Sequence, residues 1–302
     1  EAGIRWDWES FPQFMDAADQ RGSAINLGFL VPLSPLRTYV LGTDANERAA
    51  SREETQTVAA LLRDAINAGA WGFSTTASRQ HIGHGGKPLS ARLASRDELA
   101  AYCDVLKQAN RGVIEMALTK RYANLDADEE EFLTFMVNAS ERPVTWLSLH
   151  NLAEKPNEIN NILDRVAPLI KRGALPQILT RPLLYDMNLR RPFMFTEMHS
   201  AKAVFDASFE TQMAIYADVG FRKAFKDELK LGRKWAGLAQ NITIVSVENP
   251  ALKQYQGMTV GEVASLRGKD ADDTFFDIAV EDQLQVKYVS GACYSAHHLR
   301  TR

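Results

Sequence analysis

Short apolar runs alternate along the chain with longer segments whose apolar residues recur at helical spacing. The short runs predict strands, and the segments with helical spacing predict amphipathic helices. Strands that alternate with helices indicate βαβ units around a parallel sheet, and runs that are apolar throughout are typical of strands covered on both faces. The strands are predicted at Ala24–Val31, Ala70–Thr76, Gly112–Thr119, Pro143–His150, Ala174–Pro182 and Asn241–Glu248, and the helices at Arg52–Ala68, Arg96–Ala109, Asp128–Val137 and Asn157–Lys171.

Two of the predicted helices begin at a capping box. Ser51 precedes Glu54 by three residues, and Ser95 precedes Glu98 in the same way. In this pattern each of the two side chains accepts a hydrogen bond from a backbone N–H that the helix leaves unpaired. The pattern therefore predicts where both helices start.

The alternation breaks at about residues 183–238, where aromatic residues and arginines are frequent. We expect this segment to form a lid or edge region on the same core. No glycine-rich phosphate-binding pattern follows any predicted strand, which disfavours an open dinucleotide-binding sheet. The predicted fold is therefore α/β, a (β/α)8 TIM-type barrel, with residues 1–302 forming one partial barrel domain that carries the insert.

Composition places the chain among ordinary globular proteins. It has 302 residues, of which 45% are hydrophobic and 24% charged, and a net charge of −3. We expect no nucleic-acid partner, because no basic stripe with interleaved aromatics is present, and no membrane span, because no apolar run approaches about 18 residues. Two cysteines are too few for a disulfide framework, which favours a cytoplasmic protein.

The two ends of the chain suggest that it is part of a longer protein. It begins with EAGIRWDW, without a methionine, and stops at AHHLRTR. We therefore expect a barrel that is incomplete at both ends and inactive as an isolated chain.

The stretch Gly257–Asp282, GMTVGEVASLRGKDADDTFFDIAVED, is one of three that resemble segments of a single family. This stretch is similar to a segment late in the barrel of the N-acyl-D-amino-acid deacylases (D-aminoacylases) of the amidohydrolase superfamily. Leu30–Gly42 and Ala68–Thr76 resemble two further segments, in the same order and at similar spacing. The stretch from Trp71 to Arg92, WGFSTTASRQHIGHGGKPLSAR, also matches one branch of the family.

This resemblance implies a metal-dependent amide hydrolase. Zinc would activate a bound water and polarise the acyl carbonyl, and an aspartate would act as general base. The family's His-x-His pair and metal-bridging cysteine are expected before Glu1, and its catalytic base after Arg302, so no catalytic residue is assigned within the chain.

The two metal-ligand positions expected inside the chain are occupied by residues that do not bind zinc. Alignment with the family places Ala117 and Ser148 there. Glu115 and His150 each lie two residues away, on the same face of their strands, and are the candidate metal contacts. Either the register is shifted by two residues, or this branch has lost one or all of its metal ions. Otherwise Glu115 pairs with an Arg or Lys, and His150 caps a helix or bonds a backbone carbonyl.

The polar residues at the ends of the predicted strands are candidates for substrate binding. Arg79 is suited to bidentate binding of a substrate carboxylate, and the hydroxyls of Ser74 and Thr75 to orienting the acyl group. We also expect His81 and Arg181 to contact the substrate. The alternative is a solvated glycine-rich loop with incidental histidines, and a structural salt bridge at Arg181.

The function predicted from the resemblance is hydrolysis of a linear C–N amide in a small-molecule N-acyl amino acid. One alternative is a metal-free, catalytically degenerate barrel that binds a small acyl compound or a protein partner. A third possibility is hydrolysis of a different bond, such as an ester, in the same pocket.

Overall fold

The computed structural model describes residues 3, 5–79, 81–83, 86–119, 124–149, 157–178, 183–195, 198–205, 207–231 and 238–292. The chain divides into two compact units, residues 1–179 and 180–302, and each is described by itself. No described helix is long and apolar enough to cross a membrane.

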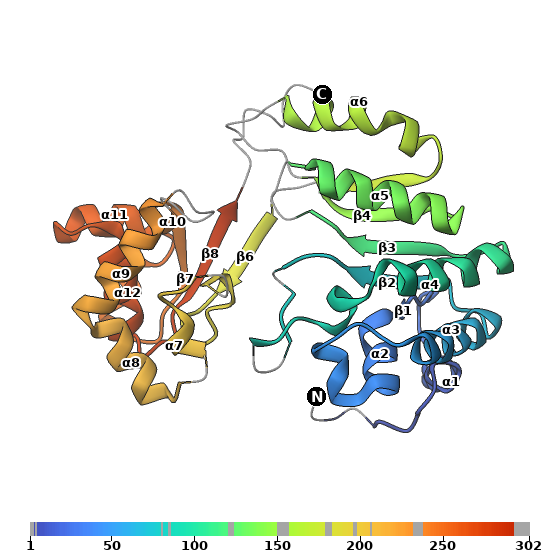
Figure 1. The fold of residues 1–302 in the computed structure, drawn as a ribbon. Coiled ribbons are helices and arrows are strands. Elements are labelled where there is room, and N and C mark those ends of the chain that lie inside the picture. The colour runs from blue at the N-terminus through green and yellow to red at the C-terminus, as the bar shows by residue number, and fades with distance from the viewer. Residues whose placement is uncertain are drawn as a thin grey trace. The chain divides into compact units, whose positions relative to one another are not determined.

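The first unit is built on a five-stranded parallel sheet, whose strands alternate with helices in Figure 1. Its strands lie in the order in which they occur along the chain. A parallel sheet with strands in chain order is the arrangement of a (β/α)8 barrel wall, whereas a dinucleotide-binding sheet reverses its order at the centre. The strands are β1 (Val31–Pro32), β2 (Gly72–Thr76), β3 (Val113–Ala117), β4 (Val144–Leu149) and β5 (Ala174–Ile178).

The helices between these strands confirm the four predicted from the sequence. Both predicted capping boxes form, at Ser51 with Glu54 and at Ser95 with Glu98. A third capping box, Asp126 with Glu129, starts its helix one residue earlier than predicted. The helices are α3 (Arg52–Asn67), α4 (Arg96–Ala109), α5 (Ala127–Ser140) and α6 (Glu158–Ile170).

The strand predicted at Ala24–Val31 is wrong except for its last residue. Only Val31 belongs to β1, whereas Ile25 and Leu27 are 72% and 50% exposed. The apolar run therefore does not mark a buried segment. The chain instead enters helix α2 (Leu33–Leu41) directly after Pro32; the unit also contains α1 (Phe11–Arg21) and the 3-10 helices η1 (Gly42–Asn46) and η3 (Ser90–Leu93).

The core of the first unit lies between one face of the sheet and its helices. Each of the central strands β2, β3 and β4 contributes fully buried side chains to this core: Phe73, Ile114, Met116 and Trp146. Cys103 of α4 belongs to the same core, and burial raises the pKa of its thiol to about 12. Side chains between these positions point to the opposite face, which is the inner face of a barrel.

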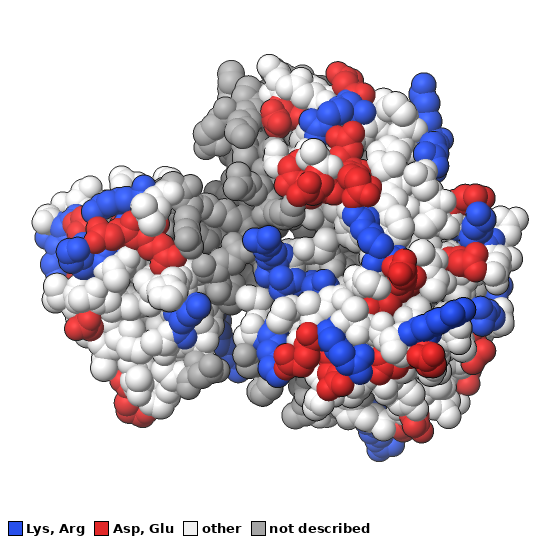
Figure 2. Space-filling model, in the orientation of Figure 1, with Lys and Arg blue, Asp and Glu red and all other residues white. Residues whose placement is uncertain are grey.

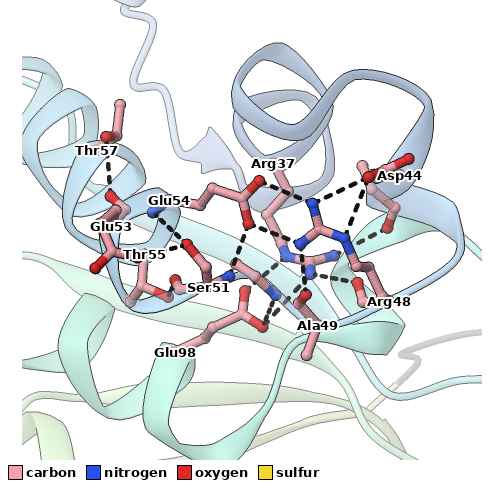
Figure 3. Close-up of polar contacts among 12 residues, drawn as sticks. Arg37, Asp44, Arg48, Ala49, Ser51, Glu53, Glu54, Thr55, Thr57 and Glu98 are labelled. Carbon is pink, nitrogen blue, oxygen red and sulfur yellow. Dashed lines mark hydrogen bonds and ion pairs between the residues drawn. The ribbon is translucent and has the colours of Figure 1, made fainter.

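A fully buried ion pair connects the segments beside this sheet. Arg37 of α2 and Glu98 of α4 are 0% and 1% exposed, and Arg37 Nε lies 2.8 Å from Glu98 Oε2. The Arg37 guanidinium also donates to the carbonyl oxygens of Ala45, Arg48 and Ser90. Figure 3 shows this network beside the exposed ion pairs of Arg48.

Glu98 is equally well supplied with partners. Its carboxylate accepts hydrogen bonds from the backbone N–H groups of Ala50 (2.8 Å) and Ser95 (3.0 Å) and from the hydroxyl of Tyr102 (3.2 Å). A buried ion pair is favourable only when such bonds satisfy its remaining donors and acceptors. Both side chains meet that condition.

The second unit contains a three-stranded antiparallel sheet in the order β6-β8-β7, with helices packed against it. Its strands are β6 (Leu183–Met187), β7 (Ile242–Ser246) and β8 (Lys287–Ala292). Its helices are α7 (Lys202–Phe205), α8 (Phe209–Ala217), α9 (Val219–Lys230), α10 (Leu238–Asn241), α11 (Val260–Arg267) and α12 (Ala271–Glu281), with the 3-10 helices η4 (Phe193–Phe195) and η5 (Pro250–Tyr255).

The segment predicted as an insert, 183–238, lies within this second unit and does not end at residue 238. It shares one aromatic core with the segment that follows, since the rings of Phe225 and Phe276 are 5.1 Å apart. The two compact units accordingly divide between residues 179 and 180. That residues 1–302 form one barrel domain stays a prediction.

The surface carries charges of both signs. Figure 2 shows basic and acidic side chains interspersed over the face in view. Exposed ion pairs such as Lys107–Glu141 and Arg165–Glu130, each at 2.7 Å, belong to this pattern.

The buried ion pair should dominate the stability of the first unit. We expect Arg37→Met to lower the free energy of unfolding by about 3–5 kcal/mol, because Glu98 would keep a buried charge without its cation. Urea unfolding of the full-length protein, followed by tryptophan fluorescence, measures the change. The control is Lys107→Met, which breaks an exposed pair and should cost less than about 1 kcal/mol. Equal effects of the two substitutions would contradict the expectation.

Candidate functional site

A cavity of about 610 Å³ lies at the carboxyl ends of the strands of the first unit. Barrel enzymes place their active sites at this end of the sheet. Strands β2, β3 and β4 line one side of the cavity, and α2, η1 and η3 line the other. The lining residues are Pro32, Leu33, Ser34, Pro35, Thr38, Asn46, Ser74, Thr75, Thr76, His81, Leu89, Ser90, Ala91, Glu115, Ala117 and Leu147.

A larger hollow of about 810 Å³ is a weaker candidate. All of its lining residues come from helix α5, including Glu130, Thr134 and Asn138. A hollow beside one helix face brings together no residues from different strands. The cavity at the strand ends is therefore the candidate site.

The strands place the inner side chains of the sheet in two layers. Register puts Ser74, Glu115 and Thr145 side by side on β2, β3 and β4. Two residues further along, Thr76, Ala117 and Leu147 form the next layer. Glu115 therefore lies one layer deeper than Ala117, the position at which the family resemblance expects a metal ligand.

Glu115 has an amide partner, not the Arg or Lys considered from the sequence. The side-chain Nε2 of Gln177, on β5, donates to Glu115 Oε1 at 3.4 Å and to Thr145 Oγ1 at 3.1 Å. The carboxylate identifies the Gln177 atom that faces it as nitrogen, because a carboxylate only accepts. The bond orients Glu115 and leaves its second oxygen without a partner among the described residues.

The loop after β2 is held in place by its own hydrogen bonds. The carbonyl of His81 accepts from the Leu89 N–H and from Arg92 Nη1, both at 3.2 Å. Gly83 N–H donates to the carbonyl of Lys87 at 2.7 Å, and Ile82 forms an antiparallel bridge with Pro88. The described residues on the two sides of this loop are therefore joined by backbone hydrogen bonds.

His81 is exposed overall. Partial desolvation of its imidazole lowers the pKa below the ordinary value of 6.5, and the positive charge of Arg92 lowers it further. Its Nδ1 lies 2.8 Å from the hydroxyl oxygen of Thr76. A neutral imidazole has one donor and one acceptor nitrogen, so it interacts with a ligand without adding charge.

The structure brings together four of the residues predicted from the sequence. Ser74, Thr75, His81 and Glu115 all line the cavity. Arg79 is exposed on the loop and is not among the described lining residues. Arg181 and His150 lie outside the described residues, so their predicted roles stay predictions.

Other residues of the site were not identified from the sequence. Thr76 lies two residues after Ser74 in its predicted strand, and the period of two places Gln177 on one face with Arg181, but period alone does not reveal the partners of Thr76 or Gln177. Ser34, Asn46 and Ser90 reach the cavity from helices rather than strands. Ser34 lies in the stretch Leu30–Gly42, and the resemblance of this stretch to the family is the only indication in the sequence that Ser34 belongs to the site.

The described residues do not form a metal centre. Among them, no group of three or more His, Cys, Asp or Glu side chains lies close enough to hold a metal ion. A catalytic zinc site takes three protein ligands and a water. Glu115 and His81 are the only side chains of these types among the described lining residues, and two donors are not sufficient.

The lowered pKa of His81 can be measured directly. We expect histidine NMR signals of the full-length protein to show His81 titrating below 6.5. Arg92→Gln should raise this pKa because it removes a nearby positive charge, whereas Arg63→Gln on the exposed face of α3 should not change it. Since the unfolded chain binds the proton first, His81 should cost stability as pH falls from 6.5 toward the folded value. A pKa at or above 6.5 would refute this.

Comparison with known proteins identifies the fold. No protein-family model matches the chain, and no curated protein matches it. Two solved structures of D-aminoacylase are each 17% identical to it and superpose with TM-scores of 0.51 and 0.52. Each match covers 94% of this chain and 47% of that chain. An N-acyl-D-glutamate deacylase from Bordetella bronchiseptica, also 17% identical, gives a TM-score of 0.48 over 94% and 48% of the two chains.

These matches are to enzymes about twice as long as this chain. One of the D-aminoacylase structures concerns a binuclear metal centre, and another describes a novel subset of amidohydrolases. At this level of identity the similarity shows the fold alone, and family membership stays a prediction. The chain has the α/β fold of the D-aminoacylase barrel and spans about half of it.

Proposed function

We propose that the full-length protein hydrolyses a linear C–N amide bond in an N-acyl amino acid, releasing an amino acid and a carboxylic acid. The observation that supports this most directly is the cavity at the strand ends, which combines Ser74, Thr75, His81 and Glu115. The fold shared with D-aminoacylase makes an amide substrate the natural choice. A cytoplasmic location and a small-molecule substrate remain predictions.

The size and chemistry of the cavity suit such a substrate. Its volume of about 610 Å³ falls within the range of about 300–1,000 Å³ found for small-molecule sites. Leu33, Pro35, Leu89 and Leu147 provide apolar contacts for an acyl chain. A few polar groups on a mostly apolar lining orient a ligand, as is usual in such sites.

Most candidate residues have a proposed role in binding. The hydroxyl of Ser74 orients the acyl group, and Glu115 accepts a hydrogen bond from the amide side of the substrate. Thr75 lines the cavity but pairs in register with Met116, on the face opposite Ser74, so no role is proposed for its hydroxyl. Arg79, which is exposed, binds the substrate carboxylate with both arms of its guanidinium, and Arg181 adds a second contact. The resemblance implies zinc and a general base, but the described residues form no zinc site, so binding and orientation are the roles assigned here.

A second candidate function is binding of a small acyl compound by a catalytically degenerate barrel. It is favoured by Ala117, which lines the cavity at the position of an expected ligand histidine and has only a methyl group to offer. The same cavity would serve both functions. Catalysis and metal content distinguish them.

Amine release tests the hydrolase proposal. We expect the full-length protein, in metal-replete buffer, to release amine from at least one member of a panel of N-acetyl-D- and N-acetyl-L-amino acids. Ser74→Ala should lower kcat/KM about five- to tenfold, because one hydrogen bond to the substrate contributes about 1 kcal/mol. Ser23→Ala, in an exposed segment of the same unit, serves as the control. Absence of amine release from the whole panel would refute the proposal.

Metal content separates the two candidate functions. The hydrolase proposal predicts near-stoichiometric zinc in the full-length protein by elemental analysis, and a lower content in Glu115→Ala and His150→Ala. The control is Glu210→Ala, which changes an exposed carboxylate in the second unit. A protein that contains no metal and still binds N-acetyl amino acids supports the degenerate barrel instead.

A further inference from the structure

The end of strand β2 carries a three-residue hydrogen-bonded arrangement at the cavity. Thr76 is 9% exposed, and its hydroxyl oxygen accepts the backbone N–H of Ser78 at 3.1 Å. The same oxygen lies 2.8 Å from Nδ1 of His81. Both Thr76 and His81 line the cavity.

The single hydroxyl proton of Thr76 determines the state of the imidazole. The Ser78 N–H only donates, so that contact uses a lone pair of the Thr76 oxygen and leaves its proton available. Among the described residues, His81 Nδ1 is the acceptor within hydrogen-bonding distance of this hydroxyl. A buried hydroxyl without its hydrogen bond costs about 1–3 kcal/mol, so Thr76 donates to Nδ1. The ring proton is then on Nε2.

The position of the ring is defined from its backbone as well. The His81 N–H donates to the carbonyl of Ser78 at 3.2 Å, and the His81 carbonyl accepts from Leu89 and Arg92. The backbone and Nδ1 of His81 are therefore both engaged. The Nε2–H is the polar group of this residue that is left for a ligand.

We propose that Thr76 is a positioning residue that holds His81 in its Nε2–H tautomer, and that His81 donates this hydrogen bond to the carbonyl oxygen of an acyl ligand in the cavity. The ligand part rests on the proposed function, whereas the tautomer does not. Partial desolvation and the charge of Arg92 lower the pKa of the ring, which favours its neutral form, and Glu115 is the other ionisable side chain among the described lining residues.

A neutral, fixed N–H donor has a specific chemical use. It stabilises negative charge that develops on a carbonyl oxygen, and it does so without reorganising at the moment of reaction. The Nδ1–H tautomer would not suffice, because Nε2 would then be an acceptor and would repel the carbonyl oxygen. Thr76 thus acts on the ligand only through His81.

Nitrogen-15 NMR of the full-length protein tests the tautomer. The His81 signals are assigned by their loss in His81→Gln. At pH 7.5 we expect an unprotonated Nδ1 and a protonated Nε2, a preference that Thr76→Val abolishes and Thr76→Ser retains. Thr57→Val, which removes an exposed hydroxyl from α3, should leave it unchanged. A protonated Nδ1 in the unsubstituted protein, or an unchanged tautomer in Thr76→Val, overturns the assignment.

Titration with N-acetyl-D-alanine tests the ligand part. We expect the probe to shift the His81 Nε2 signal, and Thr76→Val to weaken binding about fivefold, the effect of one hydrogen bond, with recovery in Thr76→Ser. If a saturating concentration of the probe leaves the His81 signals unchanged, the ligand part of the proposal is overturned, whether or not the probe is hydrolysed. Binding with the expected shift, while no member of the N-acetyl amino acid panel releases amine, supports the inference and refutes the hydrolase proposal.

Discussion

The Arg37–Glu98 ion pair is the interaction on which the candidate site depends most. It is fully buried, and its hydrogen bonds reach η1 through Ala45 and η3 through Ser90. Helix α2 and these two segments contribute the helical part of the cavity lining. These segments also pack directly against one another, and the buried pair adds polar bonds that hold them in register.

The opposite side of the cavity is determined by strand register. Residues of β2, β3 and β4 meet in layers, which places a carboxylate, Glu115, in the deeper layer and a methyl group, Ala117, in the layer above. At this upper layer the chain has a methyl group where the family resemblance implies a metal ligand. The polar groups that remain are hydrogen-bonding groups, which suit binding and orientation of an acyl amide.

Local features of the sequence were sufficient to predict four of the six α-helices that the structure describes in the first unit, and strands β2 to β5, but not α1 or α2. Capping boxes such as Ser95 with Glu98 act within one helical turn, so they can be recognised from the sequence without knowledge of the tertiary structure. The strand predicted at Ala24–Val31 failed because hydrophobicity does not report whether a segment is covered. The division into two compact units depends on which core each segment joins, which spacing along the chain does not show.

The sequence by itself determined the βα alternation, the parallel sheet and four cavity residues: Ser74, Thr75, His81 and Glu115. Only the tertiary structure decided their partners. Gln177 meets Glu115 across 62 residues, and Arg37 meets Glu98 across 61. Thr76 and His81 are five residues apart, yet their contact requires the turn between them. Spacing along a strand places a side chain on a face, but packing of distant segments selects the group it contacts.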